Sequence, residues 1–162
     1  MKQLFLIRHA KSSWDSLSQK DFDRPLNDRG HRDAPMMAKR LLDKKIEIDA
    51  FISSPAKRAF TTCKYFAEVY NVKEKNIITI PELYHAPVKN FYEVIINTDD
   101  VFNTIAIFSH NPGITDFVNE LTDAAIDNMP TCGIFGVKAA ISHWKDFEAA
   151  AKTFWFFDYP KL

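Results

Sequence analysis

Three short segments of the sequence place charged or hydrogen-bonding side chains directly after apolar runs. In the first, RHA, Arg8 and His9 follow the apolar residues 4–7. The second, SSPAKRA, contains Arg58, and the third, SHNPG, contains His110. Because desolvating a guanidinium or an imidazole is costly, such groups at the ends of buried segments need a specific reason. Guanidinium groups bind anions, and an imidazole can donate or accept a hydrogen bond at neutral pH, so these segments indicate a candidate anion site.

The apolar runs and the stretches between them predict the elements that position these side chains. We expect strands at about residues 3–7, 49–53, 76–80, 103–109, 133–140 and 152–159. Apolar residues recur at helical spacing within residues 34–42, 59–70, 91–95 and 114–121. This alternation predicts an α/β domain with a mostly parallel sheet, in which the last two strands pair antiparallel. Ligands of open α/β sheets bind beyond the carboxyl ends of the strands, where all three segments are expected to meet.

Two of the segments also have the composition of helix N-termini. Ser54 is a predicted N-cap with Pro55 as the first helical residue, and Asn111 and Pro112 repeat the pattern. Both helices would direct free backbone N–H groups and the positive end of the helix dipole at the strand ends. Arg58 would then lie in a first turn, where the dipole disfavours a cation. A bound anion would resolve that conflict.

The composition narrows the class of protein. Of 162 residues, 46% are hydrophobic and 14% aromatic, which excludes a disordered chain and predicts one domain, residues 1–162. Lys and Arg together number 21, as do Asp and Glu, so the net charge is zero and a dedicated nucleic-acid binder is not expected. The N-terminal apolar run is too short for a signal peptide or a membrane span. We therefore expect a cytoplasmic protein without a membrane partner.

Other conspicuous residues are expected to be structural. Cys63 and Cys132 lie among apolar residues and are predicted to be reduced, buried thiols. His31 and His143 are predicted to be surface or capping residues. The aromatic cluster at residues 154–157 is expected in the core and not as a base-stacking platform.

The order and spacing of the motifs resemble the histidine phosphatase superfamily, which has the phosphoglycerate-mutase-like fold, and within it the short SixA-type phosphohistidine phosphatases. RHA, SSPAKRAFTT and SHNPG carry the resemblance, and DFDRPLNDRG and PELYHA match more loosely. The resemblance implies a three-layer α/β/α sandwich with a mostly parallel central sheet and an antiparallel C-terminal part. The third residue of the first motif is usually Gly and is here Ala10, which leaves the backbone less room to approach a phosphate.

Carried over residue by residue, the resemblance implies that His9 is a nucleophile that forms a phosphohistidine intermediate. Arg8, Arg58 and His110 would surround the phosphoryl oxygens. Arg24 of DRPLN would be a further phosphate contact. The resemblance implies no cofactor, and no metal is expected because the arginines and His110 neutralise the phosphoryl charge.

The proton donor is not settled by the motifs. Most phosphomonoesterases of the superfamily protonate the leaving oxygen with a carboxylic acid in the segment that PELYHA resembles. Glu82 is the only carboxylate there and His85 stands at the acid's position, so both are candidates. An alkoxide needs strong help from an acid, whereas a leaving imidazole, whose conjugate acid has a pKa of ~6.5, needs much less. We therefore expect a monomeric enzyme that removes phosphate from phosphohistidine on a signalling or phosphotransfer protein.

Three other functions compete with this interpretation. A small general phosphomonoesterase would act on phosphorylated metabolites through the same site. A non-catalytic phosphate-recognition module would keep the arginines but would need neither histidine. A metal hydrolase could use His9 and His110, although Arg8 and Arg58 would repel the cation and few acidic residues accompany the motifs.

Overall fold

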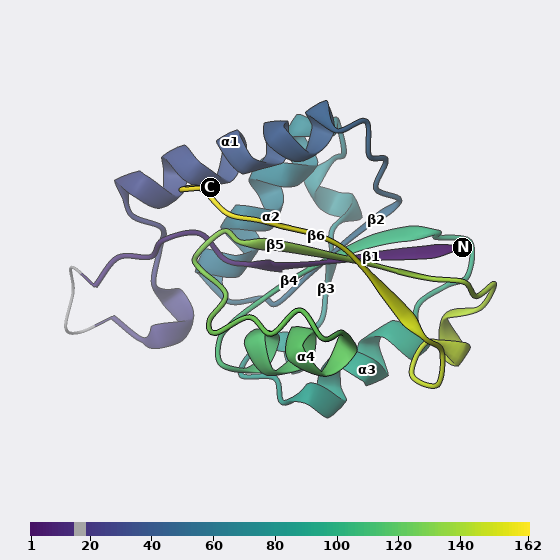
Figure 1. The fold of residues 1–162 in the computed structure, drawn as a ribbon. Coiled ribbons are helices and arrows are strands. Elements are labelled where there is room, and N and C mark those ends of the chain that lie inside the picture. Colours follow the sequence, from purple (N-terminus) through teal and green to yellow (C-terminus); the bar gives the residue numbers. More distant parts are fainter. Residues whose placement is uncertain (15–18) are drawn as a thin grey trace.

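The computed structural model describes residues 1–14 and 19–162, and it contains a six-stranded sheet covered by helices on both faces (Figure 1). The strands are β1 (Lys2–Arg8), β2 (Ala50–Ser53), β3 (Ile78–Thr79), β4 (Thr104–Ser109), β5 (Ile134–Ala139) and β6 (Lys152–Asp158). The helices are α1 (Asp28–Asp43), α2 (Lys57–Val69), α3 (Val88–Ile96) and α4 (Gly113–Leu121). Short 3-10 helices occur at Asp21–Asp23, Glu74–Asn76, Pro81–Leu83 and Trp144–Asp146. No helix among the described residues is long and apolar enough to cross a membrane.

The strand order in the sheet is β3-β2-β4-β1-β5-β6. The first four strands are parallel, β5 runs antiparallel to β1, and β6 runs antiparallel to β5. This confirms the predicted three-layer α/β/α sandwich with a mostly parallel sheet and an antiparallel C-terminal part. In Figure 1, α1 and α2 lie on one face of the sheet, and α3 and α4 lie on the other.

Alternate residues of β1 connect the sheet to the two helical layers. Leu4 and Leu6 belong to the core beneath α3 and α4, whereas Phe5 and Ile7 belong to the core beneath α1 and α2. All four side chains are fully buried. A continuous apolar run is therefore the pattern that this strand needs, because both of its faces are covered.

The strand expected at residues 76–80 and the aromatic cluster at 154–157 differ in part from the sequence-based expectations. The strand predicted at 76–80 is reduced to β3, because a 3-10 helix precedes it and Pro81, which lacks a backbone N–H, opens the next one. The aromatic cluster at 154–157 lies on the edge strand β6. Trp155, Phe156 and Phe157 are half-buried and pack against the core as expected, whereas Phe154 is 44% exposed. The prediction that Cys63 and Cys132 are free and buried is confirmed.

The parallel register brings the three motifs to one edge of the sheet. Arg8 at the end of β1 pairs with Ser109 at the end of β4, and Ser53 at the end of β2 lies beside Phe108 of β4. The residues that follow these strands therefore leave the sheet side by side. In Figure 1 the described residues between β1 and α1, 9–14 and 19–27, lie beyond this edge.

Candidate active site

Four predicted site residues lie together at the carboxyl ends of β1, β2 and β4. His9, Arg58 and His110 are buried, with 6%, 5% and 4% of their surfaces exposed, and Arg8 is half-buried. Arg58 Nε lies 3.4 Å from His9 Nε2, and the ring centroids of His9 and His110 are 5.2 Å apart. His110 also lines a cavity of about 300 Å³ together with His85 and Asn111.

The protonation of His9 follows from its contacts. Nδ1 lies 2.7 Å from the Ala10 carbonyl oxygen, which can only accept a hydrogen bond, so Nδ1 carries the proton. Nε2 then has a free lone pair and accepts from Arg58 Nε. Burial lowers the pKa of His9 to about 3, reinforced by the charges of Arg8 and Arg58 and opposed by the hydrogen bond to Ala10. The imidazole is therefore neutral at pH 7, with its nucleophilic nitrogen turned toward a guanidinium.

His110 is held in a similar neutral state. Its Nε2 lies 2.8 Å from Ser54 Oγ, and its Nδ1 is buried without a hydrogen-bond partner among the described residues. Burial, followed by the charges of His9 and Arg58, lowers the pKa of His110 to about 2. Nδ1 is thus a buried polar atom available to a ligand.

The helix starts near the site differ from the prediction. Helix α2 begins at Lys57 with Ala56 as its N-cap, two residues after the predicted cap Ser54. The Ser54 N–H donates to the Phe108 carbonyl of β4 at 3.0 Å, so Ser54 still continues the sheet and the helix begins later. Its hydroxyl accepts from the Ala56 N–H and contacts His110.

Helix α4 is displaced by one residue. It begins at Gly113 with Pro112 as N-cap. The side-chain amide of Asn111 donates to the Met129 carbonyl at 3.1 Å, and its oxygen accepts from the Thr115 hydroxyl at 2.6 Å. Asn111 therefore ties the loop before β5 to α4 and does not cap the helix.

Arg24 is buried, with 8% of its surface exposed, and is not part of a simple surface pair. Its Nε donates to the Ser13 carbonyl, its Nη2 to the Ser12 hydroxyl and its Nη1 to Asp21 at 2.9 Å. Its guanidinium carbon lies 3.3 Å from the centroid of the Trp14 ring. These contacts fix the guanidinium near His9, consistent with its charge lowering the pKa of His9.

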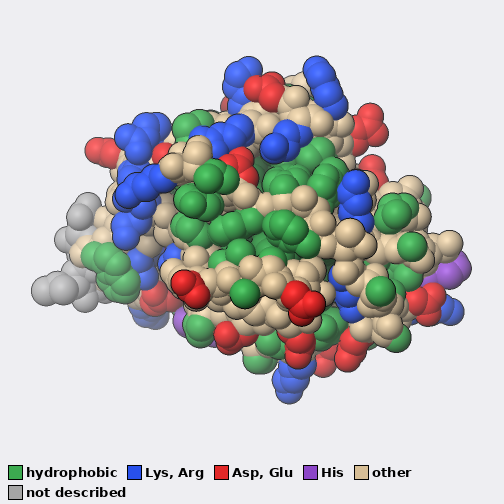
Figure 2. All heavy atoms as spheres, viewed as in Figure 1, with side chains coloured by type: hydrophobic (Ala, Val, Ile, Leu, Met, Phe, Trp, Pro, Cys, Tyr) green, Lys and Arg blue, Asp and Glu red, His purple; other side chains and the backbone are tan. Residues whose placement is uncertain are grey.

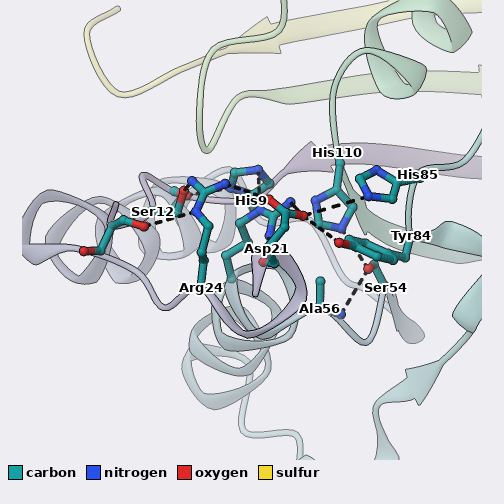
Figure 3. A network of polar contacts seen from close by, with 12 residues as sticks. His9, Ser12, Asp21, Arg24, Ser54, Ala56, Tyr84, His85 and His110 are labelled. Atoms are coloured by element: carbon teal, nitrogen blue, oxygen red, sulfur yellow. Dashed lines mark hydrogen bonds and ion pairs between the residues drawn. The ribbon is translucent and has the colours of Figure 1, made fainter. Parts of the chain in front are cut away.

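Sequence reasoning missed Asp21, whose carboxylate joins these groups (Figure 3). It accepts from Arg24 Nη1 at 2.9 Å, from Arg58 Nη2 at 3.1 Å and from the Tyr84 hydroxyl at 2.6 Å. Partial burial raises the pKa of Asp21, but the hydrogen bonds from Tyr84 and Arg24 and the charge of Arg58 outweigh it and hold the pKa well below its usual value. The spacing of three residues between Asp21 and Arg24 is the one local signal that could have pointed to it.

The two candidate proton donors lie in different places. His85 Nε2 is 3.9 Å from Asp21 Oδ2, and the His85 ring packs on Tyr84 at 3.9 Å between centroids. Glu82 is exposed, and it lines a separate cavity of about 390 Å³ beside Ile78 and Val94. The structure therefore brings His85 to the rim of the site and leaves Glu82 outside it.

Histidines and acidic residues elsewhere do not add to this cluster. His31 contacts the Tyr65 hydroxyl at 2.8 Å and His143 contacts Asp100 at 3.0 Å, both at the surface as predicted. Within residues 1–14 and 19–162, no three His, Cys, Asp or Glu side chains lie so as to hold a metal ion.

The two neutral imidazoles predict a loss of stability in mild acid. Unfolded, both take up a proton below about pH 6.5, whereas the folded protein keeps them neutral to about pH 3. The unfolded state then binds more protons, so the free energy of unfolding decreases as the pH falls, by up to about 1.4 kcal/mol per pH unit for each imidazole. Urea unfolding between about pH 7 and pH 5 measures this slope. His9→Asn should make it shallower, and a flat profile for the parent protein would contradict the prediction.

Comparison with known proteins agrees with this geometry. Residues 4–86 match the sequence model of the histidine phosphatase superfamily (branch 1). An uncharacterized chloroplastic protein of Arabidopsis thaliana is 32% identical over 154 residues, covering 90% of this chain and 70% of that protein. Phosphoserine phosphatase 1 of Hydrogenobacter thermophilus is 35% identical over 85 residues, covering 49% of this chain and 39% of that protein. The structure of the protein histidine phosphatase SixA with tungstate has a TM-score of 0.82 and 25% identity, covering 98% of this chain and 97% of that one.

A mostly parallel sheet whose strand ends present two buried imidazoles and several guanidiniums defines an α/β protein with a basic site at the carboxyl ends of its strands. The chain belongs to the histidine phosphatase superfamily, because the model of that family matches half of its length. Its fold is that of the SixA phosphohistidine phosphatases. Membership of this superfamily supports a phosphatase activity.

Proposed function

We propose that this chain is a phosphohistidine phosphatase, residues 1–162 forming one catalytic domain, in which His9 is the nucleophile. The observation that carries the proposal is the buried, neutral imidazole whose Nε2 lone pair faces Arg58. Nε2 attacks phosphorus and forms a phosphohistidine, and water then releases inorganic phosphate. A neutral imidazole needs no base to become a nucleophile at pH 7.

Two buried polar atoms support a phosphoryl site around His9. Arg8 Nε and His110 Nδ1 lack hydrogen-bond partners among the described residues. Buried polar groups are ordinarily paired, so atoms left over beside a nucleophile are suited to the oxygens of a ligand. Arg58 and Arg24 supply further guanidinium N–H groups, which match the charge-dispersed oxygens of a transferring phosphoryl group. The tungstate bound by the similar SixA structure is also a tetrahedral oxyanion.

A basic groove that begins at Arg8 supports a substrate carried on a protein. The groove has a volume of about 570 Å³, and its charged lining residues are Arg8, Lys11, Arg29, Arg32, Lys161 and Asp33. Figure 2 shows Lys and Arg side chains gathered over the start of α1 and beside the C-terminus. In a chain without net charge, this local excess favours a partner that carries negative charge near its phosphorylated residue.

One finding favours a second candidate, a phosphomonoesterase that acts on small phosphoesters. The similar protein from Hydrogenobacter thermophilus is named a phosphoserine phosphatase, although the match covers only half of this chain. The leaving groups of the two substrate classes differ in basicity, so they place different demands on a proton donor.

We predict that phosphohistidine on a protein is hydrolysed faster than alkyl phosphoesters. The experiment offers a phosphohistidine-bearing phosphotransfer protein and a panel of sugar and amino-acid phosphoesters to the same preparation, and compares kcat/KM. A leaving imidazole departs with little protonation, whereas an alkoxide does not. Faster turnover of any small phosphoester would contradict the prediction and favour the phosphomonoesterase. Glu82→Gln should leave both activities unchanged, because Glu82 lies outside the site.

A further inference from the structure

The carboxylate of Asp21 lies among the groups proposed to bind the phosphoryl oxygens. Its Oδ1 accepts from Arg24, and its Oδ2 accepts from Arg58 and from the Tyr84 hydroxyl. The Asp21 backbone carbonyl also accepts from Arg58 Nη1 at 2.7 Å. Figure 3 shows Arg24 on one side of Asp21, with Tyr84 and His85 on the other. The side chain is 40% exposed, so it lies between the buried imidazoles and solvent.

The nucleophile and this carboxylate face the same edge of one guanidinium. Arg58 Nε lies 3.4 Å from His9 Nε2, and Arg58 Nη2 lies 3.1 Å from Asp21 Oδ2. The N–H bonds of Nε and of one terminal nitrogen point to the same side of the rigid guanidinium fork. A phosphoryl group bound at this edge would have His9 on the attacking side and Asp21 within reach of its other substituents.

No other described carboxylate has this position. Within residues 1–14 and 19–162, the ion pairs of Arg24 and Arg58 are formed with Asp21 alone. Asp23, in the same 3-10 helix, is exposed, and Glu82 lines a separate cavity. The PELYHA segment brings His85 to the rim of the site but no carboxylate, so a carboxylic acid for the reaction has a candidate in a different segment of the chain.

We propose that Asp21 is the general acid that protonates the leaving group when His9 attacks. This inference rests on the proposed function and names a further catalytic residue for it. In the first step the lone pair of His9 Nε2 forms a bond to phosphorus. The bond from phosphorus to the leaving oxygen or nitrogen breaks, its electron pair stays on the leaving atom, and the Asp21 carboxyl proton moves to that atom.

The second step restores both residues. The Asp21 carboxylate accepts a proton from the attacking water, whose oxygen forms the new bond to phosphorus. The bond from phosphorus to His9 Nε2 breaks, and its electron pair returns to the imidazole. Inorganic phosphate leaves, and Asp21 is again protonated for the next transfer or loses its proton to solvent.

Asp21 is ionised in this structure, so the proposed role requires that phosphoryl binding first protonate it. Its pKa is low because it is paired with Arg24 and Arg58 and accepts from Tyr84. A bound phosphoryl group would share those two guanidiniums and would place negative charge beside the carboxylate, and both effects raise a carboxyl pKa. A phosphate monoester has a second pKa of about 6, so its monoanion can bring the proton that Asp21 passes on.

The test is a series of aryl phosphates with leaving groups of increasing basicity, from 2,4-dinitrophenyl to phenyl, followed by an alkyl phosphate. Asp21→Asn should reduce kcat roughly 10²-fold for phenyl phosphate and leave 2,4-dinitrophenyl phosphate within about threefold, because a good leaving group departs without a proton. Asp21→Ala should give the same dependence. Asp23→Asn is the matched control and should follow the parent protein across the series.

The other outcomes overturn the proposal. An equal loss for every leaving group would mean that Asp21 only positions Arg58 and Arg24. An unchanged or higher kcat throughout would mean that the carboxylate only competes with the phosphoryl group for the guanidiniums. Urea unfolding of each variant verifies that it is folded.

The experiments can contradict the proposed substrate without contradicting the proposed role of Asp21, and the reverse. A parent protein that hydrolyses the aryl series but not the phosphohistidine protein would remove the proposed substrate and leave the Asp21 test intact. Hydrolysis of the phosphohistidine protein together with an equal loss across the aryl series would remove the role of Asp21 and keep the substrate.

Discussion

His9→Asn should reduce turnover on the order of 10⁶-fold, as expected when the nucleophile of a covalent mechanism is removed. In the parent protein, rapid quench with ³²P-labelled substrate should trap a phosphoenzyme that is labile in acid and stable in base, as a phosphoimidazole is. His9→Asn should give no such label. The loss is expected to be this large because the neighbouring imidazole cannot replace it, since His110 Nε2 is engaged by Ser54.

The control for this variant is His31→Asn, which changes an exposed imidazole that contacts Tyr65. Its turnover and phosphoenzyme yield should match those of the parent protein. Urea unfolding of His9→Asn at neutral pH should show an intact fold, because the imidazole that it replaces is uncharged. A folded His9→Asn protein with substantial activity would exclude His9 as the nucleophile.

The position of His9 could be predicted because it depends on local sequence and sheet topology. The run LFLI is apolar throughout, which predicts a strand covered on both faces, and the parallel register then places Arg8 beside Ser109. The same reasoning places Arg58 and His110 at this edge. Prediction succeeds here because the groups follow strands whose buried faces fix where the chain leaves the sheet.

Features that depend on single hydrogen bonds could not be predicted. Ser54 has the side chain of an N-cap, but its N–H is taken by the Phe108 carbonyl across the sheet, so α2 begins later. Similarly, PELYHA resembles the segment that carries the proton-donating acid in the superfamily. Its first three residues form a 3-10 helix, and Glu82 lies outside the site. The Phe108 carbonyl that binds the Ser54 N–H is far from Ser54 in the sequence, so the sequence around Ser54 does not reveal it.

The position of Asp21 in the site could not be predicted from the sequence either. It lies in a polar segment before α1, where acidic residues are common. Its ion pair with Arg24 has the i,i+3 spacing that many surface pairs have. Its contacts with Arg58 and Tyr84 join residues 37 and 63 positions away. Only the folded chain places the carboxylate against the guanidinium that also faces His9.

Arg58→Ala should reduce kcat/KM by roughly 10²–10³-fold, equivalent to about 2.7–4 kcal/mol, the range found when one preorganised donor is removed from a reacting centre. Arg58 provides the Nε that faces His9 and the two terminal nitrogens that hold Asp21. Removing it withdraws positive charge from the phosphoryl group and releases the carboxylate that we propose as the acid. Steady-state kinetics with the phosphohistidine protein and with phenyl phosphate measure the loss.

Two further variants show whether geometry or charge is responsible. Arg58→Lys should recover only part of the activity, because an ammonium group cannot face His9 and Asp21 with one rigid planar edge. Lys57→Ala is the matched control, since it removes a positive charge from the adjacent, exposed residue of the same helical turn and should leave kcat/KM unchanged. Full recovery by Arg58→Lys would mean that charge alone matters at this position. Near-normal kcat/KM in folded Arg58→Ala would show that the guanidinium stabilises only the start of α2 and the Asp21 segment, and that phosphoryl binding depends on Arg8 and Arg24.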